Sequence, residues 1–153
     1  MSNRNADWLA RAFIVAMSAL AIWAWPSAPA RVPIHWNIHG QIDGYGSKLG
    51  ALVLLPFVGL GGYVLIGITA VMRPEQFDAR AIAALSWFRL AYVLMMAGVF
   101  AVVVADARGS DINMNYVVFP LLAVMMAASA NLVLQVGRRK SSKSAPPGGG
   151  VRV

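Results

Sequence analysis

Residues 49–72 read LGALVLLPFVGLGGYVLIGITAVM and contain no charged side chain. A helix needs roughly 20 predominantly apolar residues to cross the hydrocarbon core of a bilayer, so this run is long enough to span one. Residues 12–30 and 112–137 are also uncharged, and residues 81–105 contain only Arg89. We therefore predict four transmembrane helices, near residues 8–26, 50–72, 83–105 and 115–137.

The composition of the whole chain agrees with this prediction. Of the 153 residues, 59% are hydrophobic and 12% are charged, whereas soluble domains carry about 25% charged residues. These values exclude an ordinary soluble enzyme and a disordered chain, and the absence of cysteine excludes disulfides and thiolate metal sites. No alternating pattern of about ten residues recurs, which disfavours a transmembrane β-barrel. We expect residues 1–137 to form one all-α integral membrane domain.

The positive charges predict the orientation of the helices. Lys and Arg concentrate in the cytoplasmic loops of membrane proteins. With the N-terminus inside, ten basic residues are cytoplasmic and only Arg31, Lys48 and Arg108 are outside. We expect a multi-pass protein of the cytoplasmic (inner) membrane with both termini in the cytoplasm. The net charge of +7 lies at the ends of the apolar runs, which indicates membrane topology and not nucleic-acid binding.

The two ends of the sequence carry further signals. Residues 138–153 begin RRKSSKSAPPGGG and cannot bury a core, so we expect a disordered basic cytoplasmic tail. Near the start, the basic residues, the apolar stretch and Ser27–Ala30 are similar to a cleavable signal peptide. Cleavage of the first helix is therefore an alternative to its being a membrane span.

The loop at residues 27–48 is the most distinctive part of the chain. Apolar and polar residues alternate from residue 34 to 39, with Ile34, Trp36 and Ile38 on one face. This alternation predicts an extended segment. We expect a short ordered extracytoplasmic loop between the first two helices, in which Trp36 and the two isoleucines pack on the helix ends or dip into the membrane interface.

Residues flanking this segment also argue against a helix. Pro33 precedes it and Gly40 follows it, and both disfavour a helix. Asp43-Gly44 is a typical turn sequence and predicts where the chain reverses.

The histidines of the loop raise the question of a metal site. His35, His39 and Asp43 would share one face of a helix. In a strand, His35 and His39 would lie roughly 13 Å apart, which is too far for two ligands of one zinc. We therefore predict no metal and no cofactor, and we expect His35 and Asn37 to form hydrogen bonds with the loop backbone.

The same loop resembles a known signature, Pro-x-His-aromatic-Asn followed by Gly, Asp, an aromatic residue and Ser-Lys. It is similar to the N-terminal domain of unknown function of SdpI-type bacterial immunity and signal-transduction membrane proteins. The matching positions are Pro33, His35, Trp36, Asn37, Gly40, Asp43, Tyr45, Ser47 and Lys48. The resemblance implies a ligand- or partner-binding loop, and a role in toxin-peptide protection, sensing or envelope interaction. The C-terminal SdpI region of those proteins has no counterpart in this chain.

Polar residues within the predicted spans are few. Arg89 lies near the cytoplasmic end of the third span, where its long side chain can reach the interface. The alternative is a partner in the bundle, such as Asn131 or Gln135, which share one face of the fourth helix. Ala123 and Ala127 lie in register with Asn131 and predict a face for close helix packing.

The second span contains several residues that affect its geometry. Its glycines permit close approach or bending, and Pro56 should kink it near its outer end. These glycines are Gly59, Gly61, Gly62 and Gly67.

We predict a small, non-enzymatic membrane protein that binds a partner through its outer loop. One alternative is a membrane-interface hydrolase or metal-dependent enzyme that uses His35, Asp43 and Lys48, with Ser47 as the only candidate nucleophile. Another is an oligomeric transporter or channel subunit, although no span contains a carboxylate or histidine. The candidate partners are the lipid bilayer, a peptide or protein at the outer face, and a second copy of the chain.

Overall fold

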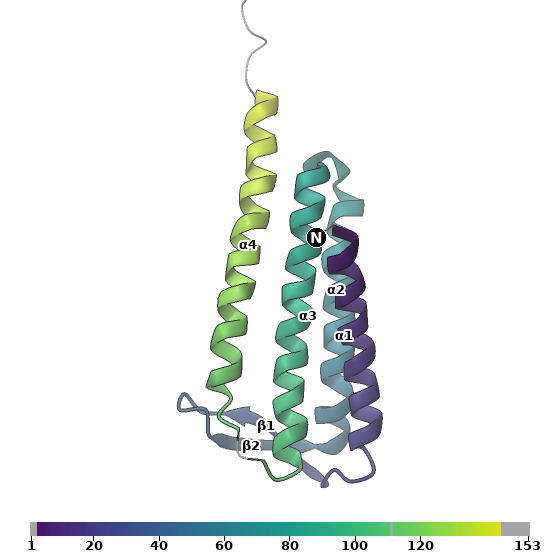
Figure 1. Cartoon of the computed structure of the whole chain (residues 1–153), viewed down its shortest axis with the longest axis vertical. Coiled ribbons are helices and arrows are strands. Elements are labelled where there is room, and N and C mark those ends of the chain that lie inside the picture. The colour runs from purple at the N-terminus through teal and green to yellow at the C-terminus, as the bar shows by residue number, and fades with distance from the viewer. Residues whose placement is uncertain (1–2, 111, 145–153) are drawn as a thin grey trace, which may run out of the picture.

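The computed structural model describes residues 3–110 and 112–144 (Figure 1). Four helices in this part of the chain are long and apolar enough to span a membrane, which confirms the predicted fold class. The long helices are α1 (Asn3–Ala24), α2 (Leu55–Met72), α3 (Ala79–Ala107) and α4 (Asn115–Ser144). Between α1 and α2 lie two strands, β1 (Arg31–Trp36) and β2 (Ile42–Ser47), and a π-helix, η1 (Gly50–Leu54). A 3-10 turn, η2 (Pro74–Gln76), connects α2 to α3.

Helix α3 is the centre of the bundle and packs against each of the other three long helices (Figure 1). The two strands lie across one end of the bundle, at the bottom of Figure 1. We call this the hairpin end, defined by residues 23–49, 106–110 and 112–115. The opposite end, defined by residues 3–11, 72–80 and 86–89, is called the N-terminal end.

Helix α4 ends later than the sequence predicts. It continues through Ser144, whereas we placed the start of a disordered tail at residue 138. That prediction was wrong for residues 138–144, because nothing in the RRKSSKS sequence breaks a helix until the Pro-Pro-Gly run that follows. The remainder of the predicted tail, 145–153, lies outside the described residues.

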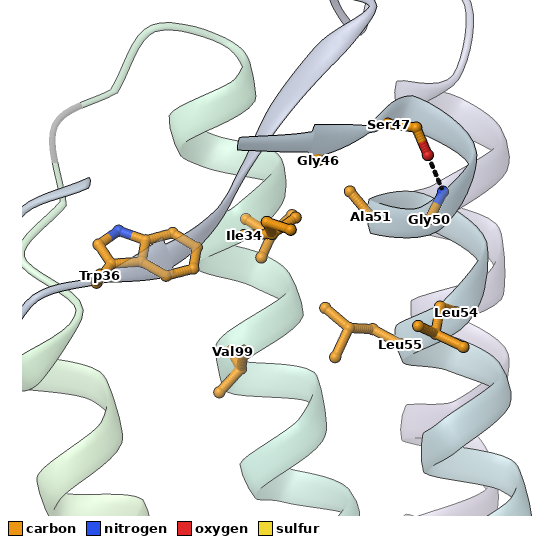
Figure 2. A pocket seen from close by; sticks show the side chains of 10 residues that line it. Ile34, Trp36, Gly46, Ser47, Gly50, Ala51, Leu54, Leu55 and Val99 are labelled. Atoms are coloured by element: carbon orange, nitrogen blue, oxygen red, sulfur yellow. Dashed lines mark hydrogen bonds between the residues drawn. The ribbon is translucent and has the colours of Figure 1, made fainter. Parts of the chain in front are cut away.

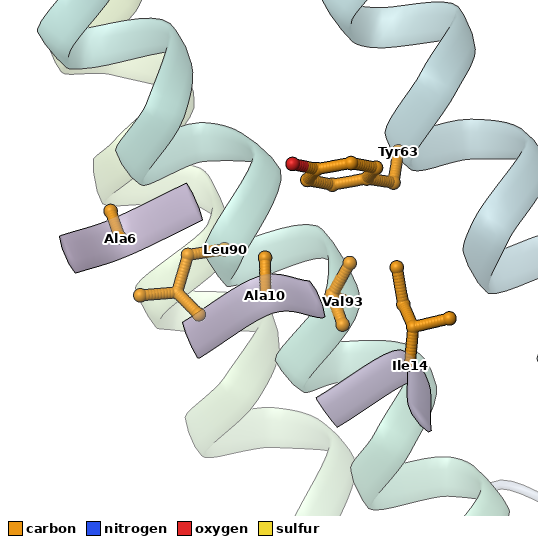
Figure 3. Packing of buried hydrophobic residues seen from close by; sticks show 6 residues of the cluster. All are labelled: Ala6, Ala10, Ile14, Tyr63, Leu90 and Val93. Atoms are coloured by element: carbon orange, nitrogen blue, oxygen red, sulfur yellow. The ribbon is translucent and has the colours of Figure 1, made fainter. Parts of the chain in front are cut away.

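Small residues bring α1 close to α3 at the N-terminal end. Ala6, Ala10 and Ile14 recur at four-residue intervals on α1 and are buried against Leu90 and Val93 of α3 and Tyr63 of α2 (Figure 3). Side chains at this spacing share one helix face. The two alanines leave little side-chain volume between the helices, so the backbone of α1 can approach α3 closely.

Glycines make room for side chains from neighbouring helices. A Cβ at Gly62 of α2 would lie 2.3 Å from the Tyr92 hydroxyl oxygen of α3. A Cβ at Gly98 of α3 would lie 2.4 Å from Leu121 Cδ1 of α4. The predicted role of the α2 glycines in close approach is thus confirmed at Gly62, whereas a Cβ at Gly61 would have no neighbour within 4 Å.

The start of the second span is irregular, as expected from Pro56. Proline lacks an N–H, and its ring clashes with the carbonyl four residues earlier in an α-helix. The chain accommodates this by forming the π-helix η1 immediately before Pro56, which occupies the first turn of α2. The wider π-turn relieves the clash without ending the span.

The predicted packing face of α4 was wrong within this chain. Ala123, Ala127 and Asn131 are exposed, and α4 meets α3 instead through the side that carries Val117 and Leu121, opposite Gly98. Spacing alone predicts which residues share a face but not which face meets the neighbouring helix.

Candidate functional site

The two strands form an antiparallel hairpin, in which Arg31 pairs with Ser47 and Trp36 pairs with Ile42. The extended segment predicted for residues 34–39 therefore ends at Trp36, and the chain reverses between Asn37 and Gln41. The turn predicted at Asp43-Gly44 was wrong, because both residues lie within β2.

Asn37 explains why the reversal occurs earlier. Its side-chain Oδ1 accepts hydrogen bonds from the backbone N–H of His39 at 2.9 Å and of Gln41 at 3.1 Å. An Asn side chain that bonds the following backbone in this way mimics a turn. The expected hydrogen bonding of Asn37 to the loop backbone is thus confirmed.

The hairpin turn is fixed to the loop between α3 and α4. Asn113 Nδ2 donates to the His39 carbonyl at 2.9 Å, and Asn115 Nδ2 donates to the Ile38 carbonyl at 2.8 Å. Gly40 has a φ of +77°, and a Cβ there would lie 1.9 Å from Asn113 Oδ1. Only glycine tolerates both this backbone conformation and the contact. The sequence analysis missed Asn113 and Asn115, whose only signal is their place in a short polar loop.

Trp36 anchors the hairpin to the end of α3. Its Nε1 donates to Asp106 Oδ2 at 3.2 Å, and the Ile112 N–H donates to Asp106 Oδ1 at 3.1 Å. Asp106 is 8% exposed, so these two bonds satisfy a buried carboxylate. The prediction that Trp36 packs on the helix ends is confirmed, and Asp106 is a partner that the sequence did not reveal.

Helix α3 ends directly beside this anchor. Gly109 has a φ of +91°, its N–H bonds to the Asp106 carbonyl, and the Ser110 N–H bonds to the Ala105 carbonyl. This is the Schellman arrangement, which requires a left-handed residue after the helix. It turns the chain back toward the hairpin and places Asp106 under Trp36.

The hairpin, the end of α1 and the start of α2 thus form one continuous unit. Residues 12–60 match the family model of a domain of unknown function, DUF1648. The match covers less than half of the chain and contains the whole hairpin. No curated protein and no solved structure matches the chain.

Within the DUF1648 region, His35 and Asp43 form an exposed pair. His35 Nδ1 lies 2.5 Å from Asp43 Oδ1, and the two side chains are 71% and 42% exposed. The expected hydrogen bond from His35 to the backbone was wrong, because strand pairing places His35 beside Gly44 and brings the Asp43 carboxylate within reach. Among the described residues, no three His, Cys, Asp or Glu side chains gather as metal ligands.

Ser47 and Lys48 lie at the base of the hairpin, where β2 ends and the chain continues into η1. Ser47 Oγ accepts from the Gly50 N–H at 3.1 Å at the start of η1. The Lys48 ammonium lies 5.0 Å from the centre of the Trp25 ring. Ser47 is four residues along β2 from Asp43, roughly 13 Å in an extended strand. The structure therefore does not bring Ser47 to the His35–Asp43 pair.

An apolar cavity of about 400 Å³ lies beneath the hairpin (Figure 2). Ile34 and Leu55 point toward one another across it in Figure 2, and both Ile34 and Trp36 line it, as their shared face of β1 predicts. Ile34 is 49% exposed and Leu54 is 61% exposed, so the cavity opens at the side of the bundle. The other lining residues are Gly46, Ser47, Gly50, Ala51, Val99 and Val103.

A second hollow of about 300 Å³ lies on the α4 side of the hairpin. It shares Ile34, Trp36 and Val99 with the first cavity, and its other lining residues are His35, Asn37, Met114, Asn115 and Val118. Trp36 therefore separates two adjoining hollows and is held in that position by its bond to Asp106.

Arg89 of α3 lies toward the N-terminal end, and its side chain contacts residues of α1 and α2. Its Nη1 lies 3.2 Å from Asp7 Oδ1, and its Nε donates to the Tyr63 carbonyl at 3.1 Å. Its guanidinium carbon lies 3.7 Å from the centre of the Tyr63 ring, and Ser86 Oγ donates to Asp7 Oδ2 at 3.0 Å. This ion pair connects α1, α2 and α3.

The structure thus gives Arg89 a partner within the bundle, as the alternative prediction expected, but this partner is Asp7 and not Asn131 or Gln135. Asn131 and Gln135 bond to each other at 3.3 Å on α4. Asp7 was missed because it precedes the predicted first span by one residue, whereas α1 begins at Asn3 and carries Asp7 into the bundle. A buried arginine is less costly with a carboxylate partner than alone, which explains why the side chain turns inward.

Proposed function

We propose that the protein is a membrane binding protein that captures an apolar peptide segment in the cavity beneath its hairpin. The observation that carries this proposal is the open cavity of about 400 Å³, roofed by Ile34 and Trp36. Ligand pockets typically enclose about 300–1,000 Å³ and are mostly apolar. This one accommodates one or two large apolar side chains from a peptide that lies at the membrane interface.

The rigidity of the hairpin supports a binding role. Asn113, Asn115 and Asp106 hold its turn and its first strand, so the cavity exists before a ligand arrives. Pre-formed sites bind more tightly because less ordering entropy is lost on association. The exposed His35–Asp43 pair lies on the same hairpin and supplies polar groups for orienting the peptide.

The biological role that fits best is protection from, or sensing of, a membrane-active peptide. Support comes from the similarity of the hairpin to the SdpI-type signature and from the expected extracytoplasmic position of the loop. Binding is favoured over hydrolysis because Ser47 and Lys48 are engaged at the base of the hairpin. The SdpI-like role, the inner-membrane location and the orientation are parts of this proposal.

Site-specific photo-crosslinking tests the cavity. A photoreactive amino acid at Ile34, which lines the cavity, should crosslink a membrane-active peptide added to cells. The matched control is the same amino acid at Ile38, which is 84% exposed on the turn and lines neither hollow. Equal crosslinking at both positions, or none at Ile34 with every peptide tested, would refute the proposal.

A cavity-filling variant tests the function. Val99→Trp places a large ring where both hollows meet and should abolish peptide protection in a cell-survival assay. Val124→Trp is the control, because Val124 is exposed on α4 and lines neither hollow. Equal survival with both variants would contradict a role for the cavity.

A further inference from the structure

The hairpin end carries three basic side chains, and each lies against an aromatic ring. The distances from the charged group to the ring centre are 6.0 Å, 5.0 Å and 4.3 Å, for Arg31 on Tyr45, Lys48 on Trp25 and Arg108 on Trp23. Within the described chain, no carboxylate forms an ion pair with any of the three. The described acids at this end are engaged elsewhere, Asp43 with His35 and Asp106 with Trp36. None of the three cations is therefore in ion-pair contact with a described carboxylate.

The backbones of two of these basic residues are adjacent where the two strands of the hairpin leave the bundle. Arg31 pairs with Ser47 in the strand register, and the Lys48 N–H donates to the Ala30 carbonyl at 3.1 Å. These contacts fix the backbone position of Lys48 just beyond the end of α1, and its ammonium lies on Trp25. Trp25, whose ring contacts the Lys48 ammonium, is of a residue type that is enriched where a membrane meets water.

An apolar hollow is lined by the same Trp25 side chain. It has a volume of about 430 Å³, lies between the end of α1 and η1, and is lined by Ala21, Ile22, Trp25, Pro26 and Val53. We call it the Lys48 groove. It shares no lining residue with the cavity beneath Ile34 and Trp36.

We propose that the Lys48 groove binds one anionic phospholipid. The headgroup phosphate lies beside the Lys48 ammonium, and one acyl chain lies in the groove along Ile22 and Val53. The Trp25 ring joins the two halves of the site, since it lines the groove and contacts the ammonium. Basic pockets at the ends of membrane helices bind acidic headgroups by this combination of charge and apolar contact.

Native mass spectrometry of the purified full chain in detergent measures this binding directly. The probes are phosphatidylglycerol and phosphatidylcholine with identical acyl chains, and the structure predicts preferential binding of phosphatidylglycerol. Lys48→Gln should weaken phosphatidylglycerol binding about fivefold, and Lys48→Arg should retain it. Arg73→Gln, which removes one positive charge at the N-terminal end, should leave binding unchanged. Equal binding of the two lipids, or equal effects of Lys48→Gln and Arg73→Gln, overturns the proposal.

A second pair of variants tests the acyl-chain half of the site. Val53→Trp fills the groove and should reduce lipid binding, whereas Val71→Trp adds the same ring at a highly exposed position near the other end of α2. Unchanged binding with Val53→Trp overturns the placement of the acyl chain.

Inorganic phosphate separates a lipid site from a simple anion site. An excess of inorganic phosphate should not displace phosphatidylglycerol, because phosphate cannot use the groove. Full displacement would show an anion site only and would overturn the proposal. Val99→Trp, which fills the other cavity, should leave lipid binding intact, so this test is independent of the proposed peptide site.

Discussion

Two side-chain pairs of the described chain, His35–Asp43 and Arg89–Asp7, lie at opposite ends of the bundle and differ in burial. His35 and Asp43 lie 2.5 Å apart with side chains 71% and 42% exposed, whereas Arg89 and Asp7 lie 3.2 Å apart at 17% and 23%. Exposed pairs stabilise a fold by about 0–1 kcal/mol. Removing one member of a fully buried pair costs about 3–5 kcal/mol, and the part-buried Arg89–Asp7 pair should lie near the lower end of that range. The N-terminal end therefore holds the helices together, and the exposed pair is available for recognition.

The largest expected effect comes from breaking the part-buried Arg89–Asp7 pair. Asp7→Ala leaves Arg89 inside the bundle without its carboxylate, and we expect a loss of about 3 kcal/mol in the free energy of unfolding, the lower end of the range for a fully buried pair. Denaturant titration of the protein in detergent measures this. The double variant Asp7→Ala with Arg89→Met should recover much of the loss, because no unpaired charge remains. A double variant as unstable as Asp7→Ala would show that the charge pairing is not the cause.

The next effect concerns the anchor of the hairpin. Trp36→Phe removes the indole donor from the buried Asp106 carboxylate, and leaving such a group partly unsatisfied costs about 1–3 kcal/mol. Amide hydrogen exchange across β1 and β2 should accelerate. Trp23→Phe is the matched control, because Trp23 is exposed and its ring contacts Arg108 rather than a strand of the hairpin. Unchanged exchange in Trp36→Phe would contradict the anchoring role.

A smaller effect is expected at the turn. Gly40→Ala forces an L-residue into a left-handed conformation at a cost of about 1–2 kcal/mol, and its Cβ displaces Asn113. Exchange of the His39 and Gln41 amides should therefore increase. Gly61→Ala, which adds a methyl group with no neighbour within 4 Å, should leave these amides unchanged. Comparable protection in the two variants would contradict the docking of the turn.

The smallest effect on stability is expected at the exposed pair. His35→Ala should change the free energy of unfolding by less than about 1 kcal/mol, because both side chains are largely solvated. The same variant should weaken peptide crosslinking at Ile34, if the pair orients the ligand as proposed. A large loss of stability in His35→Ala would contradict the prediction that the exposed pair stabilises the fold less than the Arg89–Asp7 pair does.

Hydropathy was sufficient to predict the four spans, because the energy of crossing a membrane is a sum over residues along one helix. It could not identify the partner of Arg89, since that depends on where three helices place Asp7, Tyr63 and Ser86. The alternation of Ile34 and Trp36 correctly predicted their shared face. The second strand was missed because Asp43-Gly44 is typical of a turn, whereas Asn37 already closes the chain by bonding its own turn. Two sequences in this loop, Asn37 and its neighbours and Asp43-Gly44, are each typical of a turn, and the pairing of the two strands determines which of them forms it.

The π-helix η1 makes one wall of the cavity beneath the hairpin sensitive to the number of residues in the chain. A π-turn accommodates about one residue more than an α-turn, so deleting a single residue between 50 and 54 would convert it to a regular helix. Each residue of an α-helix turns the chain by about 100°. Such a deletion would keep the span and the hairpin, yet it would re-aim Ala51 and its neighbours relative to α2. One codon could thus change which ligands the cavity accepts while leaving the membrane topology intact.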